Sequence, residues 1–284
     1  MEYHNKFGVE RMCKVFKISR SGLYDWKKRK PSARQVENQK ITKEIKIVYK
    51  ASKNRYGSPK ITNELTDRGW IVSRPRVARI MRSEGLRSII NKKYRCTTTD
   101  SNHHLPVADN RLDRDFSASR TGQKWVSDIT YIPTKHGWLY LTIVLDLFDR
   151  KVVGWALSTT MTAKDTVVTA WRMAIKNRPT KKVLFHSDRG VQYASQEFRK
   201  ELEQYHGIQS MSRKGNCWDN AVAENFFKIL KSEMVQHVKY HSILHAKNDV
   251  FEFVEIWYNR QRKHSYLGYK TPEQFGKINY LKSA

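Results

Sequence analysis

Three acidic residues stand in segments where a carboxylate is unexpected unless it has a chemical role. Asp128 interrupts an apolar and β-branched segment, Asp188 directly follows a second apolar segment, and Glu224 begins a helical pattern 36 positions after Asp188. Carboxylate oxygens are the ligands that Mg²⁺ and Mn²⁺ prefer, and one Mg²⁺ typically takes only one or two of them. The three acids therefore predict a site for two divalent ions, a site suited to cutting and rejoining the phosphodiester backbone of DNA.

Each acid has an expected position. A charge on a central strand is costly without a partner or a cation, which makes Asp128 unusual. Asp188 is expected just past a strand end, where the binding loops of α/β sheets gather. Lys228 and Lys231 follow Glu224 on one helical face. We expect Lys231 to contact a phosphate at the DNA end.

The composition of the chain favours a nucleic-acid partner. The 284 residues include 54 Lys and Arg against 27 Asp and Glu, for a net charge of +27. The first 95 residues carry 26 of the basic and 8 of the acidic residues. Such a surface binds a polyanion through long-range electrostatics and counterion release. We therefore expect the N-terminal third to make most of the DNA contacts.

Other classes of protein are disfavoured. No apolar run approaches the roughly 18 residues needed to span a membrane, and no signal-like segment follows Met1, so we expect a cytoplasmic protein without membrane partners. Cys13, Cys96 and Cys217 are far apart and form no C-x-x-C pair. This spacing indicates neither a disulfide framework nor a structural zinc site.

The periodicity divides the chain into three parts. Residues 1–95 are predicted to form a basic helical DNA-binding region, 96–121 a linker, and 122–284 a catalytic core with a C-terminal helical extension. In the first part, helix signals open at Ser58 and Ser73 and close at Gly69 and Gly85. Four arginines occupy much of the second of these helices and suit phosphate contact: Arg74, Arg76, Arg79 and Arg82. An ordinary solvated arginine face remains the alternative.

The third part reads as three consecutive strands followed by alternating helices and strands, which predicts a mixed α/β sheet flanked by helices. The expected strands are 124–133, 138–146, 151–157, 182–185 and 208–212, and the expected helices are 163–176, 195–206 and 221–234.

Aromatic residues divide into a predicted core set and one exception. We expect Trp125, Trp138, Trp155 and Trp171 to be buried. Trp218 lies instead in the basic loop 213–220, just before Glu224. An exposed ring there could wedge against a base, and the same loop offers Arg213 and Lys214 as further DNA contacts.

Four ordered motifs resemble the retroviral-integrase superfamily, and most closely the downstream-frame (OrfB-type) transposases of the insertion-sequence-three family. They are WVSDITY around Asp128, HSDRGVQY around Asp188, SRKGNCWDNA leading to Glu224 and Lys231, and a C-terminal group, which comprises Tyr258, Asn259, Arg262, His264, Leu267, Gly268, Tyr269, Thr271 and Pro272. The resemblance covers roughly residues 40–275.

The resemblance implies an RNase H-like core with a catalytic, metal-binding triad at Asp128, Asp188 and Glu224, preceded by a helix-turn-helix-type DNA-binding region. It implies strand cleavage at the terminal inverted repeats of a mobile element, joining of its ends and insertion into target DNA. We expect a homo-oligomer on paired ends, in the bacterial cytoplasm and associated with the nucleoid. No complete helix-turn-helix precedes residue 9, so an upstream-frame protein or fusion is an expected partner.

Two alternatives stay open. An RNase H-like nuclease would use the same acids but stop at hydrolysis. A non-catalytic DNA-binding regulator would use the basic region alone, with steep salt dependence and no gain from Mg²⁺.

Overall fold

The computed structural model describes residues 7–90 and 105–283. Residues 1–6, 91–104 and 284 lie outside this description, as do the side chains of Cys217 and of residues 279–283. Cys96 and the first part of the predicted linker therefore have no structural account. The chain divides into two compact units, residues 1–88 and 89–284, which are described separately. Within the described parts, every helix is too short or too polar to cross a bilayer.

The first unit is helical, as the sequence predicts. Its helices are α1 (Val9–Val15), α2 (Arg20–Lys28), α3 (Ala33–Ala51), α4 (Ser58–Asp67) and α5 (Arg74–Ser83). Lys17 has a left-handed backbone (φ 53°) at the expected break between α1 and α2, and the Ser19 hydroxyl caps α2 by accepting from the Gly22 N–H. Gly69 (φ 84°) and Gly85 (φ 68°) follow α4 and α5 at the predicted positions.

Helices α3, α4 and α5 share one apolar core. Its fully buried members include Ile41 and Ile45 from α3, Ile61 and Leu65 from α4, and Val77 from α5. Because these apolar positions recur at helical spacing, the opposite faces of the helices remain polar. The arginine-rich face of α5 is therefore available at the surface of this unit.

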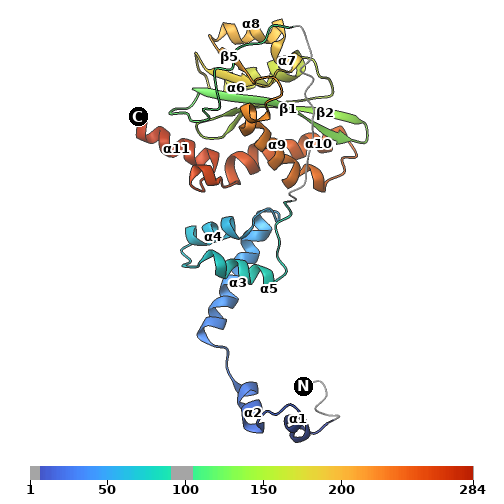
Figure 1. The fold of residues 1–284 in the computed structure, drawn as a ribbon, viewed down its shortest axis with the longest axis vertical. Coiled ribbons are helices and arrows are strands. Elements are labelled where there is room, and N and C mark those ends of the chain that lie inside the picture. The colour runs from blue at the N-terminus through green and yellow to red at the C-terminus, as the bar shows by residue number, and fades with distance from the viewer. Residues whose placement is uncertain (1–6, 91–104, 284) are drawn as a thin grey trace. The chain divides into compact units, whose positions relative to one another are not determined.

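The second unit contains the predicted mixed sheet (Figure 1). The strands are β1 (Lys124–Thr134), β2 (Gly137–Asp146), β3 (Val152–Ser158), β4 (Leu184–Ser187) and β5 (Ile208–Met211), arranged in the order β3-β2-β1-β4-β5. Strands β1, β2 and β3 pair antiparallel, whereas β4 is parallel to β1, and β5 is parallel to β4. Strand β1 is therefore central, with partners on both sides.

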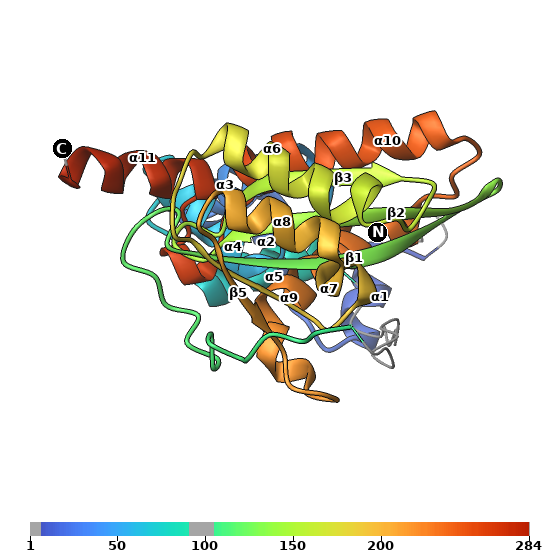
Figure 2. The ribbon, with the colours of Figure 1, turned by 90° about the horizontal axis from the view of Figure 1, so that it is seen from above.

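Helices cover both faces of this sheet. On one face lie the π-helical turn Lys164–Val168, α6 (Thr169–Asn177), α7 (Val191–Ala194) and α8 (Gln196–Gln204), which lie over the strands when seen from above (Figure 2). On the other face lie α9 (Ala221–Glu233), α10 (Ile243–Phe251) and α11 (Pro272–Ser283) (Figure 1). Helix α7, which directly follows the Asp188 turn, was not predicted because four residues give no periodicity.

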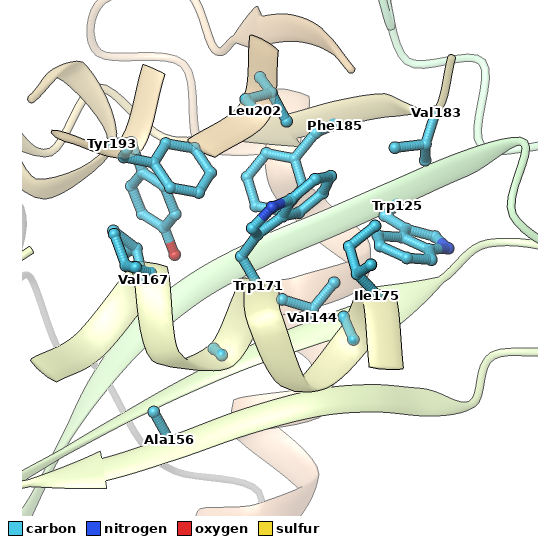
Figure 3. Close-up of a cluster of buried hydrophobic side chains, with 14 of the residues drawn as sticks. Trp125, Val144, Ala156, Val167, Trp171, Ile175, Val183, Phe185, Tyr193 and Leu202 are labelled. Atoms are coloured by element: carbon cyan, nitrogen blue, oxygen red, sulfur yellow. The ribbon is translucent and has the colours of Figure 1, made fainter. Parts of the chain in front are cut away.

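The core on the α6 face is built around Trp171. Its ring makes edge contacts with Trp125 and Phe185, at centroid distances of 5.6 and 5.4 Å (Figure 3). Gly154 on β3 lets α6 approach closely, because a Cβ there would lie 2.2 Å from the Ala170 carbonyl oxygen. This tight packing fixes the sheet that carries the acids.

The prediction that four tryptophans are core residues is only partly correct. Trp125 and Trp171 are fully buried, and Trp155 is partly buried. Trp138 was wrongly assigned to the core, since 56% of it is exposed. It stands at the start of β2, beside the tight turn from β1, and its ring makes an edge contact with Tyr131 (6.1 Å).

The C-terminal motif fastens its segment to the sheet. The Asn259 side chain donates to the Val152 carbonyl and accepts from the Val152 N–H, both at 3.0 Å. Arg262 donates to the buried Glu233 on α9, and the Trp257 indole N–H donates to the same carboxylate. These contacts hold α9, and hence Glu224, against the rest of the unit.

Candidate active site

Strand register brings Asp128 and Asp188 together. Val126 on β1 pairs with His186 on β4 in the parallel ladder. Asp128 lies two residues further along β1, and Asp188 lies two residues after His186, just past the end of β4, so both acids lie at the same end of this strand pair. Two acids 60 positions apart in sequence are thus neighbours in space.

Glu224 reaches this place from a third element. It is the fourth residue of α9, a helix that packs against β1. Just before α9, the Asn220 amide donates to the Ser127 carbonyl at 3.0 Å, and Ser127 directly precedes Asp128. This bond fixes the start of α9 beside the first acid.

Each of the three carboxylates affects the ionisation of at least one of the others. Burial raises the pKa of Asp128 well above its ordinary value, and the charges of Asp188 and Glu224 raise it further. Partial burial of the Glu224 carboxyl group raises its pKa as well, again with a contribution from Asp188. Each negative charge therefore disfavours the others, which is the behaviour of acids that share one site.

The protein also holds the two strand acids in place through backbone donors. The Ile129 N–H donates to Asp128 Oδ1 (2.8 Å), and the Gly190 N–H donates to Asp188 Oδ1 (3.0 Å). A Cβ on Gly190 would lie 3.1 Å from that same Asp188 oxygen. Behind them, the Tyr193 hydroxyl bonds to the Ser127 hydroxyl (2.8 Å). Burial and the charges of both aspartates raise the pKa of Tyr193, so it is a neutral support.

The two lysines of α9 occupy different environments. Lys231 is buried (7% exposed), and its charge lowers the pKa of Asp128, so it lies close to that acid. Lys228 is exposed. Of the two, Lys228 has the more accessible charge for DNA, while Lys231 offsets negative charge at the acids.

The loop before α9 is organised around Asp219, which is fully buried. Its carboxylate accepts from the Arg213 backbone N–H and guanidinium, from Arg114 Nε and from Asn110 Nδ2, all at 2.8–3.0 Å. Bonding to Arg213 is the main reason that the pKa of Asp219 lies far below its usual value. The Arg213 guanidinium is thus engaged within the protein, whereas Lys214 and Trp218 are exposed.

The described residues contain no preformed metal cage. Among them, His, Cys, Asp and Glu side chains nowhere form a group of three or more that could hold a metal ion as placed. The three acids therefore interact through their charges without closing into a ligand shell.

The predicted DNA contacts of α5 lie in the first unit. Arg74, Arg79 and Arg82 are exposed there. Arg76 is partly buried and is bonded to Glu37 (2.7 Å) and Asn38 (2.8 and 2.9 Å) on α3. Its guanidinium therefore ties two helices together in this structure.

Comparison with known proteins identifies the family. Models described as integrase core domain match residues 118–217 and 206–272, and one described as HTH-like domain matches residues 36–94. Transposase InsF for insertion sequence IS3A of Escherichia coli (strain K12) is 39% identical over 282 residues, which cover 98% of this chain and 97% of the relative. The chain belongs to the insertion-sequence-three family of transposases. The predicted RNase H-like integrase fold and helix-turn-helix-like N-terminal region are thereby confirmed.

A second relative of the transposase is the insertion element IS600 uncharacterized 31 kDa protein of Shigella sonnei. It is 41% identical over 265 residues, covering 93% of this chain and 97% of that protein. The transposase is also similar to a solved structure of the HTLV-2 integrase catalytic core domain in complex with magnesium (19% identity, TM-score 0.44), over 56% of this chain and 99% of that one.

Sequence reasoning missed the residues that support the acids of the transposase. Asn110 and Arg114 fall in the predicted linker, yet they bond to Asp219, more than 100 positions away. In the sequence, Asp219 and Asn220 stand out only as members of the motif that leads to Glu224. The signal that could have singled out Asp219 is its position as an acidic residue within the basic loop 213–220.

Proposed function

We propose that Asp128, Asp188 and Glu224 hold divalent cations, two Mg²⁺ or Mn²⁺ ions, and that the transposase uses this centre to cut and join DNA strands. The observation that carries the proposal is the placement of the three acids on β1, just past the end of β4, and in the first turn of α9, a helix that packs against β1. The donor set fits the ions, since carboxylates are the hard oxygen ligands that Mg²⁺ takes, with water and substrate phosphate completing the shell.

The roles of the protein groups follow from their positions. When bound, the ions would stabilise the attacking and the leaving oxygens of a displacement at phosphorus. Asp128 on β1 and Asp188 just past the end of β4 would supply carboxylate oxygens to the ions, each carboxylate being held by a backbone N–H, that of Ile129 or of Gly190. Glu224, an exposed residue in the first turn of α9, would complete the set of carboxylate ligands.

We extend the proposal to the DNA. Exposed Lys228 and Lys214 would contact the strand at the centre, and Arg74, Arg79 and Arg82 would contact DNA phosphates through the first unit. The substrates would be the terminal inverted repeats of the insertion sequence and its target DNA. Two copies would act on paired ends, with an upstream-frame protein or fusion contributing to end recognition.

The deciding experiment is a cleavage and joining assay. Purified transposase would be incubated with end-labelled duplexes of the element's ends and a separate 3′-hydroxyl acceptor, with Mg²⁺, with Mn²⁺ or with a chelator. Cation-dependent nicks and joined products are expected. Nicks that never lead to joining would indicate a nuclease. Binding with a steep salt slope, but no reaction with either ion, would indicate a regulator.

A further inference from the structure

Trp218 is presented to solvent at the edge of the candidate active site. It lies in the short 3₁₀ turn Cys217–Asn220, and 69% of the residue is exposed. Single apolar residues at a surface are ordinary, so exposure alone indicates nothing. What distinguishes Trp218 is how firmly its backbone is held and what lies next to it.

The bonds around Trp218 hold its backbone on both sides. The Asn216 side chain accepts from the Trp218 N–H at 3.2 Å. The next residue, Asp219, is the buried acceptor for Arg213, Arg114 and Asn110. The residue after that, Asn220, is bonded to the Ser127 carbonyl. The turn is therefore pre-organised, so ordering it on binding costs little entropy.

The same bonds tie the turn that carries Trp218 to the strand that carries Asp128. Asn220 is tied to the residue preceding Asp128, and Glu224 follows four positions later on α9. Lys214 lies exposed in the same loop. A cationic groove combined with an aromatic face is the combination by which proteins bind unpaired nucleotides, since every base offers a ring face to stack on.

We infer that Trp218 stacks on a nucleobase adjacent to the scissile phosphate and thereby holds the opened strand at the carboxylates. This inference rests on the proposed function and adds to it a direct contact with a base. The stacked base must leave its partner in the duplex, and the indole would replace the lost stacking. The contact tolerates any base, so it would position the strand without reading its sequence.

The first test measures stacking without requiring any cleavage. Duplexes carrying the fluorescent base 2-aminopurine at each position flanking the element end would be mixed with the wild type, Trp218→Ala and Trp218→Phe, with a chelator present. An indole stacked on the probe quenches its emission. We expect quenching at one flanking position with the wild type and its loss with Trp218→Ala. Equal quenching by both proteins at every position would overturn the inference.

The second test measures cleavage of the same duplexes in Mg²⁺. Trp218→Ala is expected to cleave between about 5-fold and about 150-fold more slowly, the range that one base stack provides. Trp218→Phe, which keeps a ring, should retain most of the rate. Trp138→Ala is the matched control, because Trp138 is also exposed (56%) but stands at the β1–β2 hairpin. Unchanged cleavage by Trp218→Ala would contradict the inference.

The two tests separate the inference from the proposed function. A wild type that quenches the probe but never cleaves supports the Trp218 contact and contradicts the catalytic proposal. If the wild type cleaves and Trp218→Ala cleaves equally fast, the catalytic proposal is supported and the Trp218 contact is contradicted. Because the Trp218 ring is exposed, the alanine variant should keep the thermal unfolding midpoint of the wild type, and that measurement confirms that it is folded.

Discussion

Asp219 and Glu224 lie five positions apart in one motif, yet the protein treats their charges in opposite ways. Asp219 is fully buried among donors, and bonding to Arg213 holds its pKa far below the ordinary range. At Glu224, burial and the charge of Asp188 raise the pKa. At Asp128, too, burial raises the pKa above its ordinary value, and the charges of Asp188 and Glu224 raise it further. One acid is compensated within the fold, and the others are left to repel one another.

The buried pair Asp146 and Asp149 shows that a raised pKa alone does not mark a functional site. Asp146 and Asp149 are fully buried at the end of β2, and burial raises the pKa of Asp146. There the strongest opposing influence is the charge of Arg178, which bonds to both acids at 2.6 and 2.7 Å. At Asp128, by contrast, the charge of Lys231 is the weakest of the named influences. At Asp128 the leading influence after burial is another carboxylate, Asp188, which raises its pKa further, and this sets the candidate active site apart from the Arg178 cluster.

The largest expected effect is the loss of catalysis when the carboxylate of Asp128 is removed. Asp128→Asn should reduce strand cleavage by roughly 1,000-fold or more, the scale on which loss of a catalytic group acts in other enzymes. DNA affinity should be retained, because the basic surface is unchanged. Asp165→Asn, which changes an exposed acid bonded to Thr160 and Thr162, is the control. Cleavage by Asp128→Asn at the rate of the Asp165→Asn control would show that the Asp128 carboxylate has no catalytic role.

The next effect concerns the compensated cluster at Arg178. Arg178→Met should lower the free energy of unfolding by about 3–5 kcal/mol, because it leaves two buried carboxylates without their cation. Arg172→Met, in helix α6 six residues before Arg178, is the matched control, since Arg172 pairs with Glu201 at the surface and should cost at most about 1 kcal/mol. Urea unfolding would measure both. Equal losses would show that burial of the pair at Arg178 is unimportant.

The smallest expected effect concerns stability and pH: the change in unfolding free energy should vary with pH in opposite directions for Asp219→Asn and Asp128→Asn. Asp219→Asn should cost about 1.5–3 kcal/mol near neutral pH, by removing bonds to a charged acceptor. Because the folded pKa is lowered, this stability is present above the unfolded value of about 3.9 and is lost as the pH falls below it. The deficit of Asp219→Asn should therefore shrink in acid.

Asp128→Asn should show the opposite trend in the metal-free protein. The folded pKa of Asp128 is raised, so its charge begins to destabilise the fold only as the pH rises through about 3.9. The variant should match the wild type in acid and become more stable toward neutral pH. Unfolding free energies measured from pH 3 to 8 would check both variants. Parallel pH profiles would contradict the assignment of opposite roles.

The sequence was most informative where local pattern and chemistry coincide. A charge within the β-branched segment around Asp128 and an acid after a short apolar run both indicate strand positions, and the glycines after α4 and α5 mark helix ends. The contacts between Asp219 and residues 110 and 114 were hidden, because such tertiary bonds leave no periodic signal. Trp138 was misjudged for a related reason. An alternating strand pattern does not show whether a helix covers the strand end.

The central claim is that three acids, distant along the chain, form one cation-binding centre. Its most direct test is electron paramagnetic resonance of Mn²⁺ bound to the protein with its DNA end, comparing the wild type with Asp128→Asn, Asp188→Asn and Glu224→Gln and with the Asp165→Asn control. We predict that each of the three variants loses bound Mn²⁺ while the control keeps it. Wild-type Mn²⁺ binding in all three variants would contradict the claim.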